Sequence, residues 1–153
     1  MHGFAKCHEY HSIEENKGYY CLLHYFFSHY HKLIQVEKST YPEIIPQTWY
    51  KYTTMAVDAN TKRQSTKDMM KKWEEWERST KKLYQEMYRA LLDINEVAAA
   101  LCLQCYIEDV DKELEYVEKK IIKLESLDYA IGTIVGWQNT MYDKFTKAIK
   151  HIY

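Results

Sequence analysis

The sequence predicts an all-α fold, a helix bundle built as one domain over residues 1–153. Only 4 Gly and 2 Pro occur in 153 residues, so few positions interrupt a helix. A stripe of apolar residues at alternating steps of four and three is the second observation, and it consists of Leu103, Ile107, Val110, Leu114, Val117, Ile121 and Leu124. Charged residues fill the other faces of this segment, so the helix needs partner helices to bury the stripe.

We expect the first helix over residues 4–34. The apolar positions that keep helical spacing in this segment are Tyr19, Leu22, Phe26, Tyr30 and Leu33. Projected backwards, the same stripe passes through Glu15, Ser12 and His8. The pattern therefore predicts a carboxylate, and an imidazole with it, on the face of this helix that enters the core.

A long crossover is expected over residues 35–64, because helical periodicity fades there and Pro42 and Pro46 favour an extended chain. Trp49 and Tyr50 make the segment too apolar for a free linker, so we expect it to lie against the bundle. A connection of this length normally has a topological or functional role.

Three further helices are predicted, over residues 65–92, 96–125 and 128–152. Ser65 and Asp68 have the spacing of a capping pair at the start of the first of these helices. A second such pair in residues 93–96 marks a short break before the helix that carries the stripe. Ser126 and Asp128 are expected to start the last helix. Four long helices with one crossover are typical of a helix bundle.

Charge and hydropathy exclude several classes of partner. The net charge is −1, and the 21 basic and 22 acidic residues are interspersed, which argues against a nucleic-acid arm or a basic membrane patch. No apolar run approaches the roughly 20 residues of a membrane span, and the first residues lack the apolar core of a signal peptide. We expect a soluble protein without nucleic-acid or membrane partners, in the cytoplasm or the secretory pathway.

Acidic residues near the packed faces are the candidates for chemistry. They are Glu15 on the first helix, Glu77 on the second, and Glu108, Asp109 and Glu113 on the third. Carboxylates that converge in a bundle core build di-iron sites, usually with a Glu-x-x-His pair on a helix. That histidine is absent, since Gly18 follows Glu15 and Thr80 follows Glu77 at the required offset.

Two simpler interpretations stay open for these residues. A glutamate at the edge of an apolar stripe can extend to solvent or pair with lysine. His8, His11 and Glu15 share a face at metal-ligand spacing, but histidine is frequent in this chain and a surface row of histidines is an alternative.

Five short segments resemble ferritin subunits, in the order that this family has. Residues 3–6 and 14–20 are similar to the second ferritin helix, with a Gly18-Tyr19 pair like that of light chains. Residues 77–83 resemble the third helix, residues 106–110 the fourth and residues 141–145 the short fifth. The resemblance covers Gly3 to Phe145 and fits a light-chain type, with an arthropod or secreted form as one option. No counterpart of the family's first helix precedes Gly3.

The resemblance implies an iron-storage subunit of a hollow 24-chain shell, with an iron mineral as cargo and no organic cofactor. Its partners would be other ferritin subunits, including a heavy-chain-like ferroxidase subunit. By position, Glu15, Glu77 and Asp109 fall where ferroxidase ligands lie, while Gly18 replaces the ligand histidine and Asp109 the usual glutamine.

A centre altered in this way implies a subunit that is not an enzyme and that supports mineral nucleation and shell stability. Glu14 is the candidate for the cavity-facing surface, and Glu108 lies beside Asp109 on the fourth family helix. Two alternatives remain: an active di-iron ferroxidase in which His11 or His8 replaces the missing ligand, and a structural helical interaction protein without metal chemistry.

Overall fold

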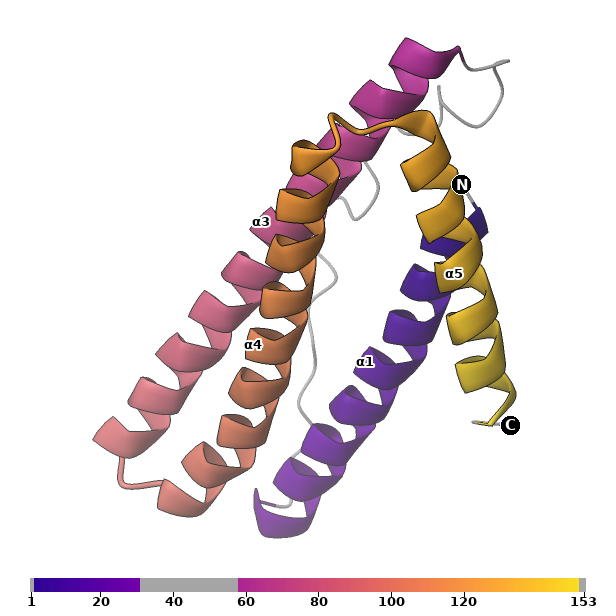
Figure 1. The fold of residues 1–153 in the computed structure, drawn as a ribbon. Coiled ribbons are helices and arrows are strands. Elements are labelled where there is room, and N and C mark those ends of the chain that lie inside the picture. Colours follow the sequence, from indigo (N-terminus) through magenta and orange to yellow (C-terminus); the bar gives the residue numbers. More distant parts are fainter. Residues whose placement is uncertain (1, 31–57, 152–153) are drawn as a thin grey trace. The chain divides into compact units, whose positions relative to one another are not determined.

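The described part of the chain is entirely helical. A computed structural model describes residues 2–30 and 58–151, which form the helices α1 (His2–Tyr30), α3 (Ala59–Asp93), α4 (Val97–Ser126) and α5 (Ile131–Lys150). Figure 1 colours these helices by sequence, from indigo for α1 to yellow for α5. Every regular element in the described ranges is an α-helix, which confirms the predicted all-α class. The ferritin-specific crossover stays a prediction.

The described residues fall into two compact units. One consists of α3, α4 and the first residues of α5 up to Ile134, and the other of α1 and the rest of α5 from Val135.

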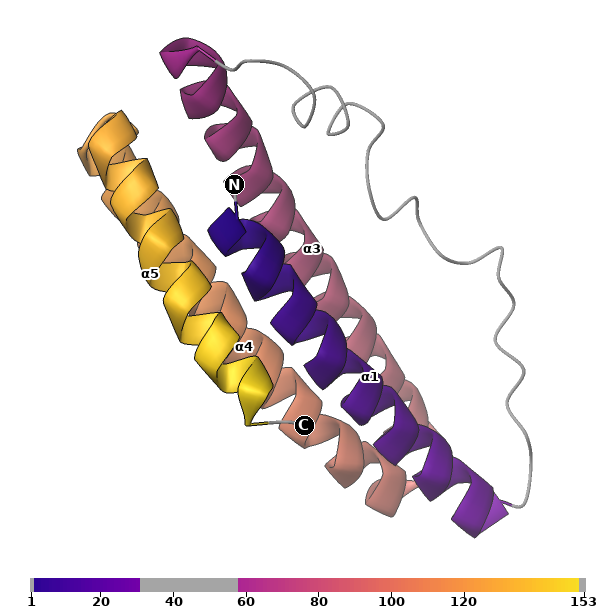
Figure 2. The same cartoon turned by 90° about the vertical axis from the view of Figure 1, so that its right-hand side faces the viewer.

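In the first unit, α3 and α4 lie side by side and run antiparallel (Figure 1, Figure 2). Ring contacts fix the register: Trp73 faces Tyr116 and Tyr84 faces Tyr106, each with ring centroids 6.1 Å apart. Residue numbers therefore rise along α3 as they fall along α4.

The predicted apolar stripe of α4 is confirmed. Its buried members are Leu103, Val110, Leu114, Val117 and Leu124, whereas Ile107 and Ile121 are half-buried. Met70 and Trp73 of α3 are also buried. Ion pairs Arg78–Glu118 and Lys81–Asp111 connect the two helices at the surface, where such pairs add little to stability but support the register.

α3 begins at Ala59, so the predicted helix start at Ser65 is wrong. Asp58 is the N-cap, and its side chain accepts a hydrogen bond of 2.8 Å from the backbone N–H of Thr61. Ser65 is instead buried inside the helix, where its hydroxyl donates to the carbonyl of Lys62. Residues 58–64 of the predicted crossover thus belong to α3 and its cap. Residues 31–57, which include the end of the first predicted helix, lie outside the described residues.

The predicted break before α4 is confirmed. Asn95 adopts a left-handed conformation with φ of 66°, and the N–H of Glu96 donates to the carbonyl of Leu91 across 2.8 Å. Glu96 occupies the N-cap position of α4 without a side-chain capping hydrogen bond. The turn is therefore held by backbone bonds rather than by the predicted capping pair.

The last helix starts later than residue 128. Ser126 ends α4, and the next turn contains Asp128 and Tyr129, with φ of 45° and 48°. This left-handed backbone cannot continue a right-handed helix, so α5 begins only at Ile131. Tyr129 is buried, and the Nζ atom of Lys67 lies 5.0 Å from its ring centroid.

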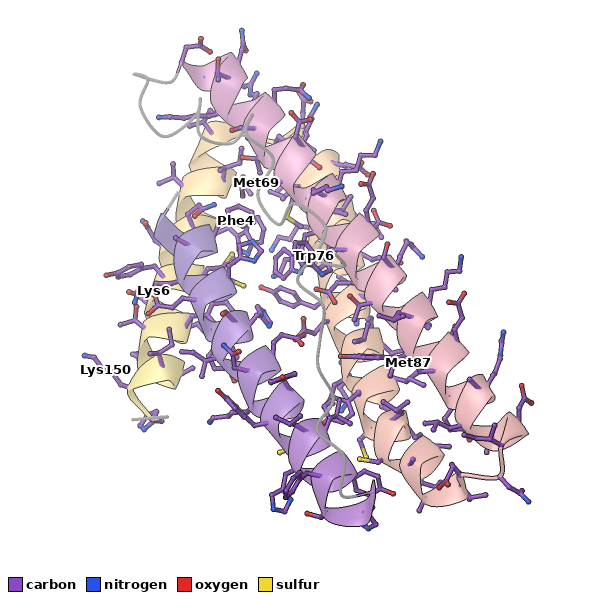
Figure 3. All side chains as sticks on the ribbon, turned by 180° about the vertical axis from the view of Figure 1, so that it is seen from behind. Phe4, Lys6, Met69, Trp76, Met87 and Lys150 are labelled. Carbon is purple, nitrogen blue, oxygen red and sulfur yellow. The ribbon has the colours of Figure 1, made fainter. Side chains whose placement is uncertain are left out.

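In the second unit, α1 and α5 run in the same direction. Phe4 meets Trp137 edge to face at 5.0 Å between ring centroids, and further along Tyr10 meets Phe145 at 5.3 Å. The backbone N–H of Phe4 donates to Oε1 of Gln138 across 3.0 Å, which satisfies one of the free donors at the start of α1. Figure 3 shows Phe4 near the beginning of α1 and Lys150 at the end of α5.

The predicted packed face of α1 is wrong by one position. Ser12, Glu15 and Tyr19 are exposed, and the packed face instead includes Phe4, Cys7 and, half-buried, His11. Aromatic side chains lie on every side of this helix, so apolar spacing did not single out one face. The shift of about 100° around the helix puts His11 rather than His8 on the packed side.

Candidate metal-binding site

Tyr10, His11 and Glu14 form a cluster of polar side chains on one face of α1. The hydroxyl of Tyr10 donates to Oε1 of Glu14, and Nδ1 of His11 lies 3.9 Å from Oε2 of the same carboxylate. Residues three and four positions apart are neighbours on a helix surface, which explains why both side chains reach Glu14. One oxygen of the Glu14 carboxylate thus accepts a hydrogen bond from a phenol, and the other lies near an imidazole.

Phe145 of α5 supports the rings of this cluster. Its buried ring lies 5.3 Å from the ring of Tyr10 and 5.8 Å from that of His11, measured between centroids. The side chain of His11 is 21% exposed and that of Glu14 is 45% exposed. The ring bodies are therefore packed, while the carboxylate remains accessible to ions from solution.

Glu15, the next residue along α1, lies four positions after His11 and is exposed. It is turned by about 100° around the helix from Glu14. The contacts of Tyr10 and His11 given above go to Glu14, the first of the two adjacent glutamates predicted as metal ligands.

Glu77 lies in the contact between α3 and α4, which we call the α3–α4 seam. It is half-buried, and its Oε1 accepts a hydrogen bond of 2.9 Å from Nε1 of Trp73. The antiparallel register places Glu113 of α4, also half-buried, at the same level, between the Trp73–Tyr116 and Tyr84–Tyr106 contacts. Each of the two helices therefore has one half-buried glutamate at this level.

Glu108 and Asp109 lie on the exposed surface of α4. Glu108 accepts a hydrogen bond of 3.2 Å from the side chain of Gln104. Asp109 is 69% exposed, and its Oδ1 pairs with Nζ of Lys112 at 2.8 Å. This hydrogen bond raises the pKa of Lys112. Both carboxylates point to solvent and have partners within α4.

Tyr10 is the member of the cluster that the sequence analysis missed. The available signal was its position four residues before Glu14, the spacing at which a phenol can donate to a carboxylate. A phenol packs well in a core, but its deprotonated oxygen is also an iron ligand.

Comparison with known proteins assigns the chain to no family. No protein-family model matches it, and neither a curated protein nor a solved structure matches it. In the described ranges, none of the helices carries an apolar stretch long enough to cross a membrane. The ferritin resemblance therefore rests on the short sequence segments alone.

Proposed function

We propose that this chain is an iron-storage subunit of ferritin type, which binds iron without oxidising it rapidly. The observation that carries the proposal is the group of oxygen and imidazole donors around Glu14, since hard oxygen ligands and imidazole suit iron. The order of the ferritin-like segments between Gly3 and Phe145 supports it as well.

The contacts of the expected ligands support a non-catalytic role. Gly18 stands in place of a ligand histidine, and Asp109 is paired with Lys112 at the surface. The carboxylate of Glu77 accepts a hydrogen bond from the indole N–H of Trp73. Fast oxidation needs ligands that hold two iron ions close together, whereas Asp109 and Glu77 contact partners within their own helices. A separate ferroxidase subunit is the partner that this role requires.

Particle size is the decisive measurement for the storage proposal. Light scattering and negative-stain images of the purified chain should show a large hollow sphere that retains iron after Fe(II) is added in air. A particle of the size of a single bundle would overturn the shell assignment. Stopped-flow measurements should show Fe(II) oxidation no faster than in buffer. Rapid oxidation would instead favour the active ferroxidase, with His11 as the replacement ligand.

A structural interaction protein is the second candidate, because large apolar side chains are exposed on α3, α4 and the turn between them. The exposed fractions are 54% for Leu83, 67% for Ile94 and 55% for Leu101. Trp76 and Met87, which Figure 3 labels along α3, are partly exposed too. Contiguous apolar patches mark protein–protein contacts, and these side chains are the candidates for such a patch. A bundle-sized particle that retains no iron would favour this function.

A further inference from the structure

We propose that Tyr10, His11 and Glu14 form a ferric-iron site in which the Tyr10 phenolate is a ligand. The inference deepens the proposed function and takes from it only that iron is the metal. It does not require a shell. The three residues lie close together along α1, so one helix supplies all three protein ligands.

The donor set fits Fe(III). A carboxylate and a phenolate are hard, anionic oxygen donors, and imidazole nitrogen is a frequent iron ligand. None of the three residues is a thiol, so the set does not favour soft metals.

The hydrogen bond between Tyr10 and Glu14 places two oxygen donors next to each other before metal arrives. The Tyr10 hydroxyl donates to Oε1 of Glu14, so the phenol oxygen already lies beside the carboxylate. When Fe(III) binds, the Tyr10 O–H bond breaks, an iron–oxygen bond forms and the proton leaves to solvent. Iron keeps its oxidation state, so the step needs no oxidant or reductant.

His11 lies close enough to Glu14 to complete the set. Its Nδ1 atom lies 3.9 Å from Oε2 of Glu14, a separation at which both atoms can bind one metal ion through bonds of about 2.1 Å. Phe145 packs against the rings of both Tyr10 and His11 and limits their rotation. Three protein donors leave the other iron positions to water, which suits a site where a mineral begins to grow.

The test is visible absorption after ferric nitrilotriacetate is added to the purified chain. A phenolate bound to Fe(III) gives a charge-transfer band that aqueous or carboxylate-bound iron lacks. We expect this band in the wild type and its loss in Tyr10→Phe. Glu14→Gln and His11→Gln should each weaken iron binding at least about tenfold, the scale of lost metal contacts.

Tyr20→Phe is the matched control, since Tyr20 is an exposed tyrosine on the same helix outside the cluster. It should keep the full band. Circular dichroism of each variant establishes that the helices are intact, so a lost band reports lost ligation. A wild type without the band, or a Tyr10→Phe variant that retains it, would overturn the site.

Measuring particle size on the same samples separates this inference from the storage proposal. A bundle-sized particle with the band supports the Tyr10 site and contradicts the shell. A hollow shell without the band contradicts the Tyr10 site and leaves storage standing.

Discussion

The backbones of Gly3 on α1 and Gln138 on α5 are in direct contact. A Cβ atom at Gly3 would fall 2.0 Å from the carbonyl oxygen of Gln138, far inside van der Waals distance. Glycine is therefore required at this position by close approach. The same contact brings the Phe4 N–H onto the Gln138 side chain.

Replacement of Gly3 by alanine should separate the start of α1 from α5. We expect Gly3→Ala to destabilise the protein by about 1–3 kcal/mol, the usual cost of forced overpacking, measured by chemical denaturation. Gly132→Ala is the control, because nothing lies within 4 Å of the Cβ it would add to α5. This control should stabilise the protein by up to about 1 kcal/mol through helix propensity. Equal effects of the two variants would contradict the close contact.

The α3–α4 seam depends on the apolar stripe of α4. Leu103 is almost completely buried, so Leu103→Ala should cost roughly 2–5 kcal/mol in unfolding free energy. Ile122 lies on the exposed side of the same helix, and Ile122→Ala should change stability by less than about 0.5 kcal/mol. Urea denaturation of both variants checks the difference. A large loss in Ile122→Ala would mean that another surface covers that side.

The α4 stripe was predictable from sequence because its aliphatic residues lie on one face and charged residues on the others. Residues 2–30 lack this contrast. Exposed Phe27 is as apolar as buried Phe4, and exposed Tyr20 is aromatic as well, so the packed face depends on which residues α5 contacts. The start of α3 was missed because its N-cap, Asp58, precedes a polar stretch without apolar periodicity. Helix capping there is a local hydrogen bond that apolar spacing does not report.

The candidate site was predictable only in part. The sequence predicts Glu14 as a metal ligand because it is a carboxylate and because of the ferritin resemblance. It predicts Glu77 as a metal ligand because this residue falls on an apolar stripe. The side chains that surround Glu14 could not be chosen from spacing alone, because Phe145 from the other end of the chain fixes the rings of Tyr10 and His11. The sequence predicts Asp109 near the packed face of α4, yet the next residue, Val110, takes the buried position and Asp109 faces solvent.

Asn95 is expected to be important for the turn between α3 and α4. Its φ of 66° is accessible to asparagine and glycine but strained for other residues. Asn95→Ala should cost roughly 1–2 kcal/mol in unfolding free energy, whereas Asn95→Gly should stay within about 1 kcal/mol of the wild type. Thermal unfolding monitored by circular dichroism measures both. Equal stability of the two variants would contradict a left-handed turn at this residue.

The cap of α3 should make stability depend on acid. Two hydrogen bonds from Thr61, one from its backbone N–H and one from its hydroxyl, lower the pKa of Asp58 below its ordinary value of 3.8. A carboxylate whose pKa is lowered by folding stabilises the folded state above its unfolded pKa. That stabilisation is lost as the pH falls through the folded pKa.

Asp58→Asn isolates this effect, since asparagine caps a helix about as well as aspartate but does not titrate in this range. The two proteins should have similar stability at neutral pH. As the pH falls through the folded pKa of Asp58, below 3.8, the wild type should lose more stability than Asp58→Asn, because only its cap becomes protonated. Urea denaturation at a series of pH values measures the difference. Parallel curves for the two proteins down to the lowest pH would show that Asp58 contributes no charged cap to α3.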